Sequence, residues 1–128
     1  DAAVKKNMKR AGLDYWDKVK IIEYDNLEDF KQKTKGKKMY LLSTKSKKSH
    51  TDIKYEDEAY LVFGPETRGL PEDFILENFE NAARIPMRDI IRSLNLSNAV
   101  AIVAYEAERQ LNYKDLLEVS PYFDKKLK

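Results

Sequence analysis

Apolar and polar positions divide the chain into short apolar runs separated by amphipathic stretches. Residues 19–24, 39–43 and 60–63 form runs of four to six mostly β-branched, aliphatic or aromatic residues bounded by polar or turn residues, which predicts strands. A fourth run, residues 83–87, contains Pro86, which must end or kink a strand. Runs that are apolar on both faces are typical of a parallel sheet covered by helices on each side.

Three stretches predict helices. Residues 27–35 follow Asn26, a candidate N-cap, and end near Gly36. A short helix is expected to begin within residues 70–73, with Pro71 tolerated in its first turn.

The last predicted helix spans about residues 94–112. Its segment 99–104 is apolar nearly all round, so deep burial is expected. Residues 45–57 are polar and interpreted as a loop, and residues 120–128 as a frayed tail. The element order indicates an α/β class with a mainly parallel sheet, in a single domain over residues 1–128.

The 128 residues include no cysteine and one histidine, His50. This excludes disulfides, thiolate metal sites, a cysteine nucleophile and a metal site built from several histidines of one chain. His50 lies among polar residues, where a surface role is favoured over a catalytic one. No stretch approaches the ~18 apolar residues of a membrane span, and no export signal is recognisable, so a cytoplasmic protein is the default expectation.

The net charge of +2 conceals an asymmetry. Residues 1–48 hold 14 lysines and arginines against 7 acids, and residues 31–48 hold eight lysines and no acid. Such a run indicates either a surface for a polyanion or a solvated lysine face, and both interpretations remain open.

The strongest candidate for chemistry is the stretch Phe-Gly-Pro-Glu-Thr-Arg-Gly-Leu, residues 63–70, which follows a predicted buried strand. In open α/β sheets ligands bind outside the carboxyl ends of the strands. Gly64 and Gly69 permit close backbone approach, and Glu66 adds a carboxylate. A cofactor loop and an ordinary glycine-rich turn are the two interpretations. Neither a Walker A motif nor G-x-G-x-x-G is present, so ATP and NAD have no support.

A second candidate is Ile85-Pro86-Met87 followed by Arg-Ser-Leu-Asn-Leu-Ser-Asn, residues 92–98. An N-cap explains one or two of the four serines and asparagines that precede the apolar helix. The others bind a ligand or satisfy an irregular buried backbone.

These segments, in this order and spacing, resemble the second and third motifs of the SPOUT superfamily of S-adenosylmethionine-dependent RNA methyltransferases. Residues 10–16, together with Tyr105-Glu106-Ala107 and Arg109-Gln110, narrow the resemblance to the TrmL/YibK-like tRNA wobble-nucleotide 2′-O-methyltransferases. The resemblance implies an α/β fold with a C-terminal trefoil knot that forms the cofactor pocket. It also implies S-adenosylmethionine as methyl donor, S-adenosylhomocysteine as product and no metal.

The resemblance also implies roles for individual residues. Those implied near the methyl-transfer centre are Glu66, Ser93 and Asn95. Those implied to surround the cofactor are Leu42, Gly64, Ile85, Met87, Ser93 and Leu94. The implied partners are the tRNA anticodon stem-loop, with the lysines of residues 31–48 as candidate phosphate contacts, and a second copy of the chain held through the knot-region helices.

The chain differs from the family at the family's first motif. The family's first strand and Asn-x-Gly-Asn-Ile-x-x-Arg segment, whose arginine is the candidate for activating the 2′-hydroxyl, have no match, and no arginine here takes that role. A truncated sequence is the favoured expectation, with activity only once the start is restored. The alternatives are a catalytically inactive module that binds cofactor or RNA, and an unrelated nucleotide-binding protein that uses residues 64–69 for phosphate.

Overall fold

The computed structural model describes residues 20–65, 68–88, 95–114 and 116. The chain divides into two compact units, residues 1–36 and 37–128. Predictions for the stretch at 10–16, for Glu66, Ser93 and Leu94, and for residues 120–128 lie outside the described residues. Within the described parts, no helix is long and apolar enough to cross a membrane.

The first unit contributes one described helix, α2 (Leu27–Lys33). As predicted, Asn26 is its N-cap, and the Asn26 side chain accepts a hydrogen bond from the Asp29 amide at 2.8 Å. The strand predicted at 19–24 is wrong over its described part, because residues 20–24 form no strand and Ile22 is 56% exposed. A β-branched run becomes a strand only where a neighbour supplies hydrogen bonds, and no described strand pairs with this one.

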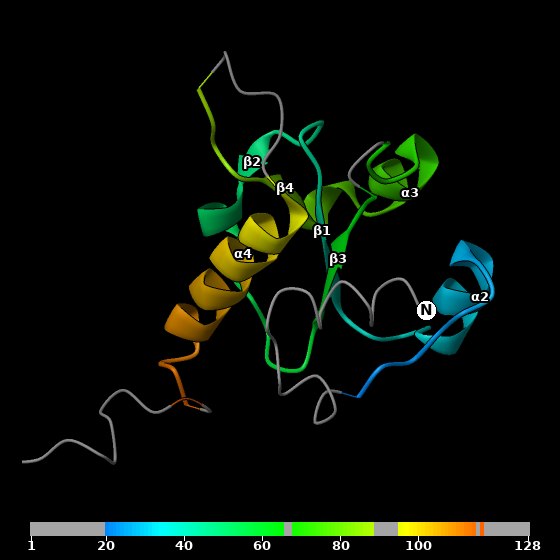
Figure 1. Ribbon diagram of the computed structural model, residues 1–128, viewed down its shortest axis with the longest axis horizontal. Coiled ribbons are helices and arrows are strands. Elements are labelled where there is room, and N and C mark those ends of the chain that lie inside the picture. Colours follow the sequence, from blue (N-terminus) through cyan, green and yellow to red (C-terminus); the bar gives the residue numbers. More distant parts are fainter. Residues whose placement is uncertain (1–19, 66–67, 89–94, 115, 117–128) are drawn as a thin grey trace, which may run out of the picture. The chain divides into compact units, whose positions relative to one another are not determined.

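The second unit is a parallel α/β layer structure (Figure 1). Its strands have the order β2-β4-β1-β3, and every described pairing is parallel, which confirms the predicted class. The elements in chain order are β1 (Met39–Leu42), β2 (Lys48–Ser49), η2 (His50–Asp52), β3 (Tyr60–Phe63), α3 (Glu72–Glu77), η3 (Phe79–Asn81), β4 (Ala82–Arg84) and α4 (Leu96–Gln110).

Two boundary predictions need correction. The polar stretch 45–57 is not only loop, because it contains β2 and η2; Ser49 caps η2 and closes a capping box with Asp52. Pro71 stands at the N-cap of α3, not in its first turn. The expectation that Pro86 ends its strand is confirmed, since β4 stops at Arg84.

The core lies between the sheet and α4 (Figure 1). Tyr40 and Leu42 of β1 pack with Ala83 of β4 and Val103 of α4, and these four side chains are at most 9% exposed. The expected deep burial of α4 is wrong, because Val103 is its only buried residue. Among the described residues, only one stripe of the helix meets the sheet, which leaves other apolar positions uncovered: Val100, Ile102 and Tyr105 are 40%, 39% and 62% exposed.

The C-terminal part of α4 is joined to the segment before β3 by the Gln110 side chain. Its amide donates to the Ile53 carbonyl at 2.8 Å, and its oxygen accepts from the Tyr55 amide at 2.9 Å. Gln110 also donates to Glu106, which receives two hydrogen bonds of 2.9 Å from Arg109. The Arg109 and Gln110 contacts lower the pKa of Glu106 to about 2, while burial, with Glu106 and Tyr40 nearby, raises that of Tyr55 to about 12. These contacts explain structurally the closing part of the motif noted in the sequence.

Candidate functional site

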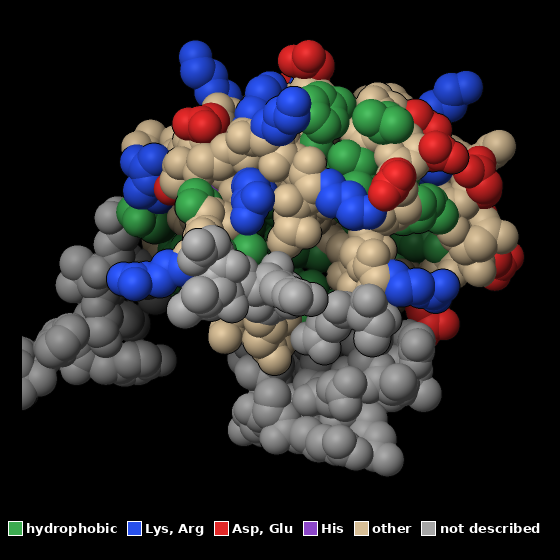
Figure 2. All heavy atoms as spheres, turned by 90° about the horizontal axis from the view of Figure 1, so that it is seen from above, with side chains coloured by type: hydrophobic (Ala, Val, Ile, Leu, Met, Phe, Trp, Pro, Cys, Tyr) green, Lys and Arg blue, Asp and Glu red, His purple; other side chains and the backbone are tan. Residues whose placement is uncertain are grey.

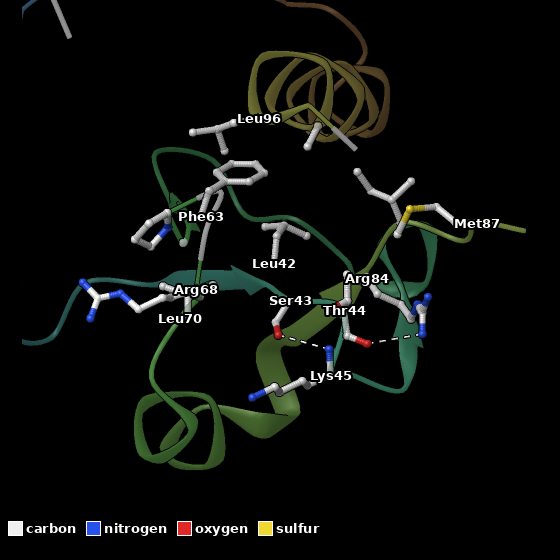
Figure 3. Close-up of a pocket in the computed structure, with 15 residues that line it drawn as sticks. Leu42, Ser43, Thr44, Lys45, Phe63, Arg68, Leu70, Arg84, Met87 and Leu96 are labelled. Carbon is white, nitrogen blue, oxygen red and sulfur yellow. Dashed lines mark hydrogen bonds between the residues drawn. The ribbon is translucent and has the colours of Figure 1, made fainter. Parts of the chain in front are cut away.

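A cavity of about 250 Å³ lies at the carboxyl ends of β1, β3 and β4, where α/β sheets bind ligands (Figure 3). Side chains from three strands and α4 surround it because β1 stands between β4 and β3 in the sheet. Its lining residues are Leu42, Ser43, Thr44, Lys45, Phe63, Gly64, Pro65, Arg68, Gly69, Leu70, Arg84, Ile85, Met87, Leu96 and Ala99.

Four of the residues implied to surround the cofactor line this one cavity: Leu42, Gly64, Ile85 and Met87. They are separated by as many as 45 positions in the sequence, and the parallel register brings them together. The other two, Ser93 and Leu94, lie outside the described residues. The cavity is therefore the only described place where the implied cofactor residues meet.

The centre of the cavity is apolar. Figure 3 shows Leu42, Phe63, Met87 and Leu96 around a common space. The sequence analysis placed Phe63 and Leu96 within its two candidate segments but assigned a role to neither. Phe63 could have been found as the last residue of a predicted strand, and Leu96 as the first apolar residue after a predicted cap. Apolar walls of this kind accept a flat heteroaromatic ring such as adenine.

One wall of the cavity is a tight turn after β1. Ser43 donates its amide to the Ala83 carbonyl at 2.9 Å, its carbonyl accepts from the Ser46 amide at 3.1 Å, and its hydroxyl accepts from the Lys45 amide at 3.1 Å. Arg84 of β4 then donates to the Thr44 carbonyl at 3.2 Å. The turn is thus attached to the neighbouring strand by the backbone bond from Ser43 and by the side chain of Arg84, and Figure 3 shows the second of these bonds.

The opposite wall is the loop that follows β3. A Cβ atom on Gly64 would stand 2.3 Å from the carbonyl carbon of Gly69 and 2.4 Å from the amide nitrogen of Leu70. Gly69 has φ +70° and donates its amide to the Pro65 carbonyl at 2.8 Å. The first glycine is therefore required for backbone approach within the loop, and the second for a left-handed conformation. A side chain at position 64 would therefore meet the loop backbone at residues 69 and 70 before it could fill the cavity.

Asn95 begins α4 and acts as its N-cap. Its side-chain oxygen accepts from the Ser97 amide at 2.9 Å. Asn95 is exposed and does not line the cavity, whereas the next residue, Leu96, does. Capping thus explains one of the four small polar residues in this segment, and it fixes where the first turn of α4 meets the cavity.

Metal chemistry has no candidate site in the described part of the chain, where no group of three or more His, Asp or Glu side chains could hold an ion. His50 is half-buried in η2, away from the cavity lining. The described site therefore consists of an apolar pocket, backbone amides and carbonyls, hydroxyls and cations.

Comparison with known proteins adds independent information. The model of the SpoU rRNA Methylase family matches residues 1–105. A Listeria monocytogenes serotype 4b (strain F2365) protein named "Putative tRNA (cytidine(34)-2′-O)-methyltransferase" is 49% identical over 125 residues, which cover 95% of this chain and 73% of that protein. The tRNA (cytidine(34)-2′-O)-methyltransferase of Escherichia coli (strain K12) is 44% identical over 110 residues, covering 84% and 69%.

Two solved structures are similar in fold. One, described as giving structural insights into the 2-OH methylation of C/U34 on tRNA, superposes with a TM-score of 0.73 at 40% identity, covering 82% of this chain and 68% of that one. The other, an AdoMet-bound rRNA methyltransferase from Sinorhizobium meliloti, gives a TM-score of 0.58 at 32% identity, covering 67% and 34%.

Proposed function

Because the chain belongs to the SpoU rRNA methylase family, we propose that it is an RNA methyltransferase that uses S-adenosylmethionine to methylate the ribose 2′-hydroxyl of the tRNA wobble nucleotide, position 34. The observation that carries this function is the cavity, where Leu42, Gly64, Ile85 and Met87 converge. The inactive-module alternative has no support from the relatives, which are named as methyltransferases.

The cavity suits the adenosyl part of the cofactor. Its volume of about 250 Å³ is near the lower end of ligand pockets, roughly 300 Å³. The apolar centre would take adenine, and main-chain groups of the two walls would meet its polar edge. When bound, the cofactor supplies an activated methyl group. The residues of the chain have to align the ribose oxygen with that methyl and accept the hydroxyl proton.

Glu66, Ser93 and Asn95 are the proposed residues near the methyl-transfer centre, and Ser93 and Leu94 complete the proposed cofactor set. Support comes from sequence position. Glu66 falls between Pro65 and Arg68, which line the cavity, and Asn95 immediately precedes Leu96, which also lines it. A carboxylate here would accept the proton that the 2′-hydroxyl loses.

Two variants separate binding from chemistry. We expect Glu66→Gln to lower kcat for methyl transfer to tRNA by at least tenfold, with the calorimetric Kd for S-adenosylhomocysteine unchanged. Asn95→Ser, which retains a capping oxygen, should also lower kcat, whereas a role restricted to capping predicts wild-type turnover for this variant. Wild-type kcat in both variants would remove these residues from the proposed centre.

The finer features of the fold are proposals as well. The trefoil knot and the single domain over residues 1–128 rest on family membership, and the cytoplasmic location on the tRNA substrate. A homodimer through α4 is supported by its uncovered apolar side chains Val100, Ile102 and Tyr105. Subunit contacts of homodimers are more apolar than the rest of a protein surface, and exposed apolar side chains that lie together are typical of them.

A further inference from the structure

The rim of the cavity is cationic. Lys45, Arg68 and Arg84 line it, and none of the described lining residues is acidic. Figure 3 shows these three side chains arranged around the apolar centre formed by Leu42 and Phe63. The space-filling view of the upper side of Figure 1 shows lysine and arginine side chains, with acidic ones among them, around recessed hydrophobic side chains (Figure 2).

The methyl donor does not account for this charge. S-adenosylmethionine carries a sulfonium, an ammonium and a single carboxylate, so its net charge is positive. Its single carboxylate balances the charge of only one of three cations, and three positive charges together repel the sulfonium and the ammonium. A nucleic acid has the opposite character, with one phosphate for every nucleotide.

We propose that Lys45, Arg68 and Arg84 form a phosphate-binding rim that holds the RNA backbone next to the methylated nucleotide. This inference rests on the proposed function and specifies which residues position its substrate. Contacts to phosphate fix the register of a nucleic acid on a protein without reading sequence. The rim therefore sets which ribose oxygen enters the cavity.

The three cations remain available for phosphate. The Lys45 ammonium lies 2.6 Å from the Glu72 carboxylate, but both side chains are more than half exposed, and such pairs contribute ~0–1 kcal/mol. A phosphate can therefore displace Glu72. One N–H group of the Arg84 guanidinium donates to the Thr44 carbonyl, and the guanidinium has further N–H groups that can donate to a phosphate. Arg68 is exposed, and no described side chain pairs with it.

Position relative to the cavity, and not pairing, distinguishes Lys45 from the other lysines of residues 31–48, because Lys45 is the one lysine of that run that lines the cavity. On α2, Lys31 and Lys33 pair with Glu28 and Asp29 of their own helix. Such i,i+3 and i,i+4 pairs are ordinary surface features of a helix. Two of the three rim cations, Arg68 and Arg84, lie outside residues 31–48, and only the fold brings them to Lys45. The proposal therefore assigns the polyanion contact at the cavity to Lys45, together with two arginines that lie outside the run.

The expected effect on RNA binding follows from counterion release. Each phosphate contact contributes a slope of about 0.7 in the dependence of log K on log salt for a single strand. Removing one contact at about 0.15 M salt should therefore weaken binding roughly fourfold, and removing two roughly fifteenfold. At about 0.05 M salt the loss per contact rises to roughly eightfold.

The experiment measures the Kd of a fluorescent tRNA anticodon stem-loop between about 0.05 and 0.3 M salt, and the Kd of S-adenosylhomocysteine by calorimetry. The variants are Lys45→Gln, Arg68→Gln and the pair together. Lys54→Gln is the matched control, because Lys54 is also an exposed lysine but does not line the cavity. Glu72→Gln removes the competing carboxylate and should tighten RNA binding, which a structural role of the Lys45 pair does not predict.

The expected result is weaker RNA binding and a smaller salt slope in the rim variants, with wild-type affinity for S-adenosylhomocysteine and no change in the control. Parallel loss of S-adenosylhomocysteine affinity would assign the cations to the cofactor and overturn the inference. Rim variants that match Lys54→Gln while the wild type methylates tRNA would overturn the inference and leave the function intact. Rim-dependent RNA binding without methyl transfer would support the inference and contradict the function, and a wild type that binds no RNA would contradict both.

Discussion

The loop after β3 allows a sharp prediction at Gly64. The change Gly64→Ala adds one carbon atom, and that atom would stand 2.3, 2.4 and 2.6 Å from three backbone atoms of Gly69 and Leu70. Ordinary van der Waals contact begins near 3.4 Å, so the Gly69–Leu70 backbone must move by about 1 Å. Because Leu70 is only 8% exposed, the movement also disturbs a packed side chain.

The cost of this movement can be bracketed. Overpacking of this kind costs about 1–3 kcal/mol, and the Gly69 amide also stands to lose its 2.8 Å hydrogen bond to the Pro65 carbonyl. If the cofactor needs the original loop, the same energy is lost from binding, which corresponds to a roughly 5- to 150-fold increase in Kd. Gly69→Ala is the comparison, because φ +70° strains alanine but no atom lies within 4 Å of its Cβ.

The assay is calorimetric titration of S-adenosylhomocysteine into the wild type, Gly64→Ala and Gly69→Ala, with urea unfolding measured in parallel. We expect the largest Kd increase in Gly64→Ala and a smaller one in Gly69→Ala. Equal Kd values for Gly64→Ala and the wild type would refute the reasoning, since the loop would then accommodate a Cβ without affecting the pocket.

Three further predictions concern stability and assembly. The pKa of Glu106 is lowered from 4.5 to about 2 by Arg109. The contribution of the ionised Glu106 to the free energy of unfolding is therefore complete above pH 4.5 and is lost as the pH falls toward 2. Glu106→Gln should cost about 1 kcal/mol at pH 7, with the difference shrinking below pH 4.5 in urea unfolding; a pH-independent difference would contradict this. Tyr40→Phe should destabilise by about 1–3 kcal/mol, because the hydroxyl, in a residue 2% exposed, bridges a backbone carbonyl and an amide at 3.0 Å; an unchanged unfolding midpoint would show that these groups find other partners. The double change Ile102→Asp and Tyr105→Glu places charges on the uncovered face of α4 and should convert a dimer to a monomer in sedimentation experiments, whereas an unaltered dimer would place the interface elsewhere.

Much of the site could be predicted because local patterns determine it. The apolar run at 39–43 forms β1, the run at 60–63 forms β3, and the spacing of Gly64 and Gly69 corresponds to a loop with a close approach and a left-handed residue. For Asn95 the sequence left helix capping and ligand binding as alternatives, and the described contact of its side chain is the capping hydrogen bond. Strand lengths and helix caps depend on residues that are close in the sequence, and local sequence patterns therefore predict them well.

Features that depend on distant neighbours could not be predicted. Arg68, Arg84 and Lys45 line one cavity only because β1 lies between β3 and β4, and the spacing of these residues in the sequence does not predict that strand order. The apolar segment within α4 indicated burial, but burial also requires a covering surface, which the described part of the chain does not supply for Tyr105. The strand predicted at residues 19–24 is wrong over residues 20–24 for the same reason: these residues have a high strand propensity, but no described strand pairs with them.

The central claim is that the cavity at the strand ends binds S-adenosylmethionine, whose methyl group is transferred to one ribose oxygen of tRNA. The most direct measurement is incubation with unmodified tRNA and isotope-labelled S-adenosylmethionine, followed by nuclease digestion and mass spectrometry of the position-34 nucleotide. The account predicts one added methyl group on the ribose of that nucleotide. A labelled methyl on a base, a label at another position, or bound cofactor with no label in the tRNA would contradict it.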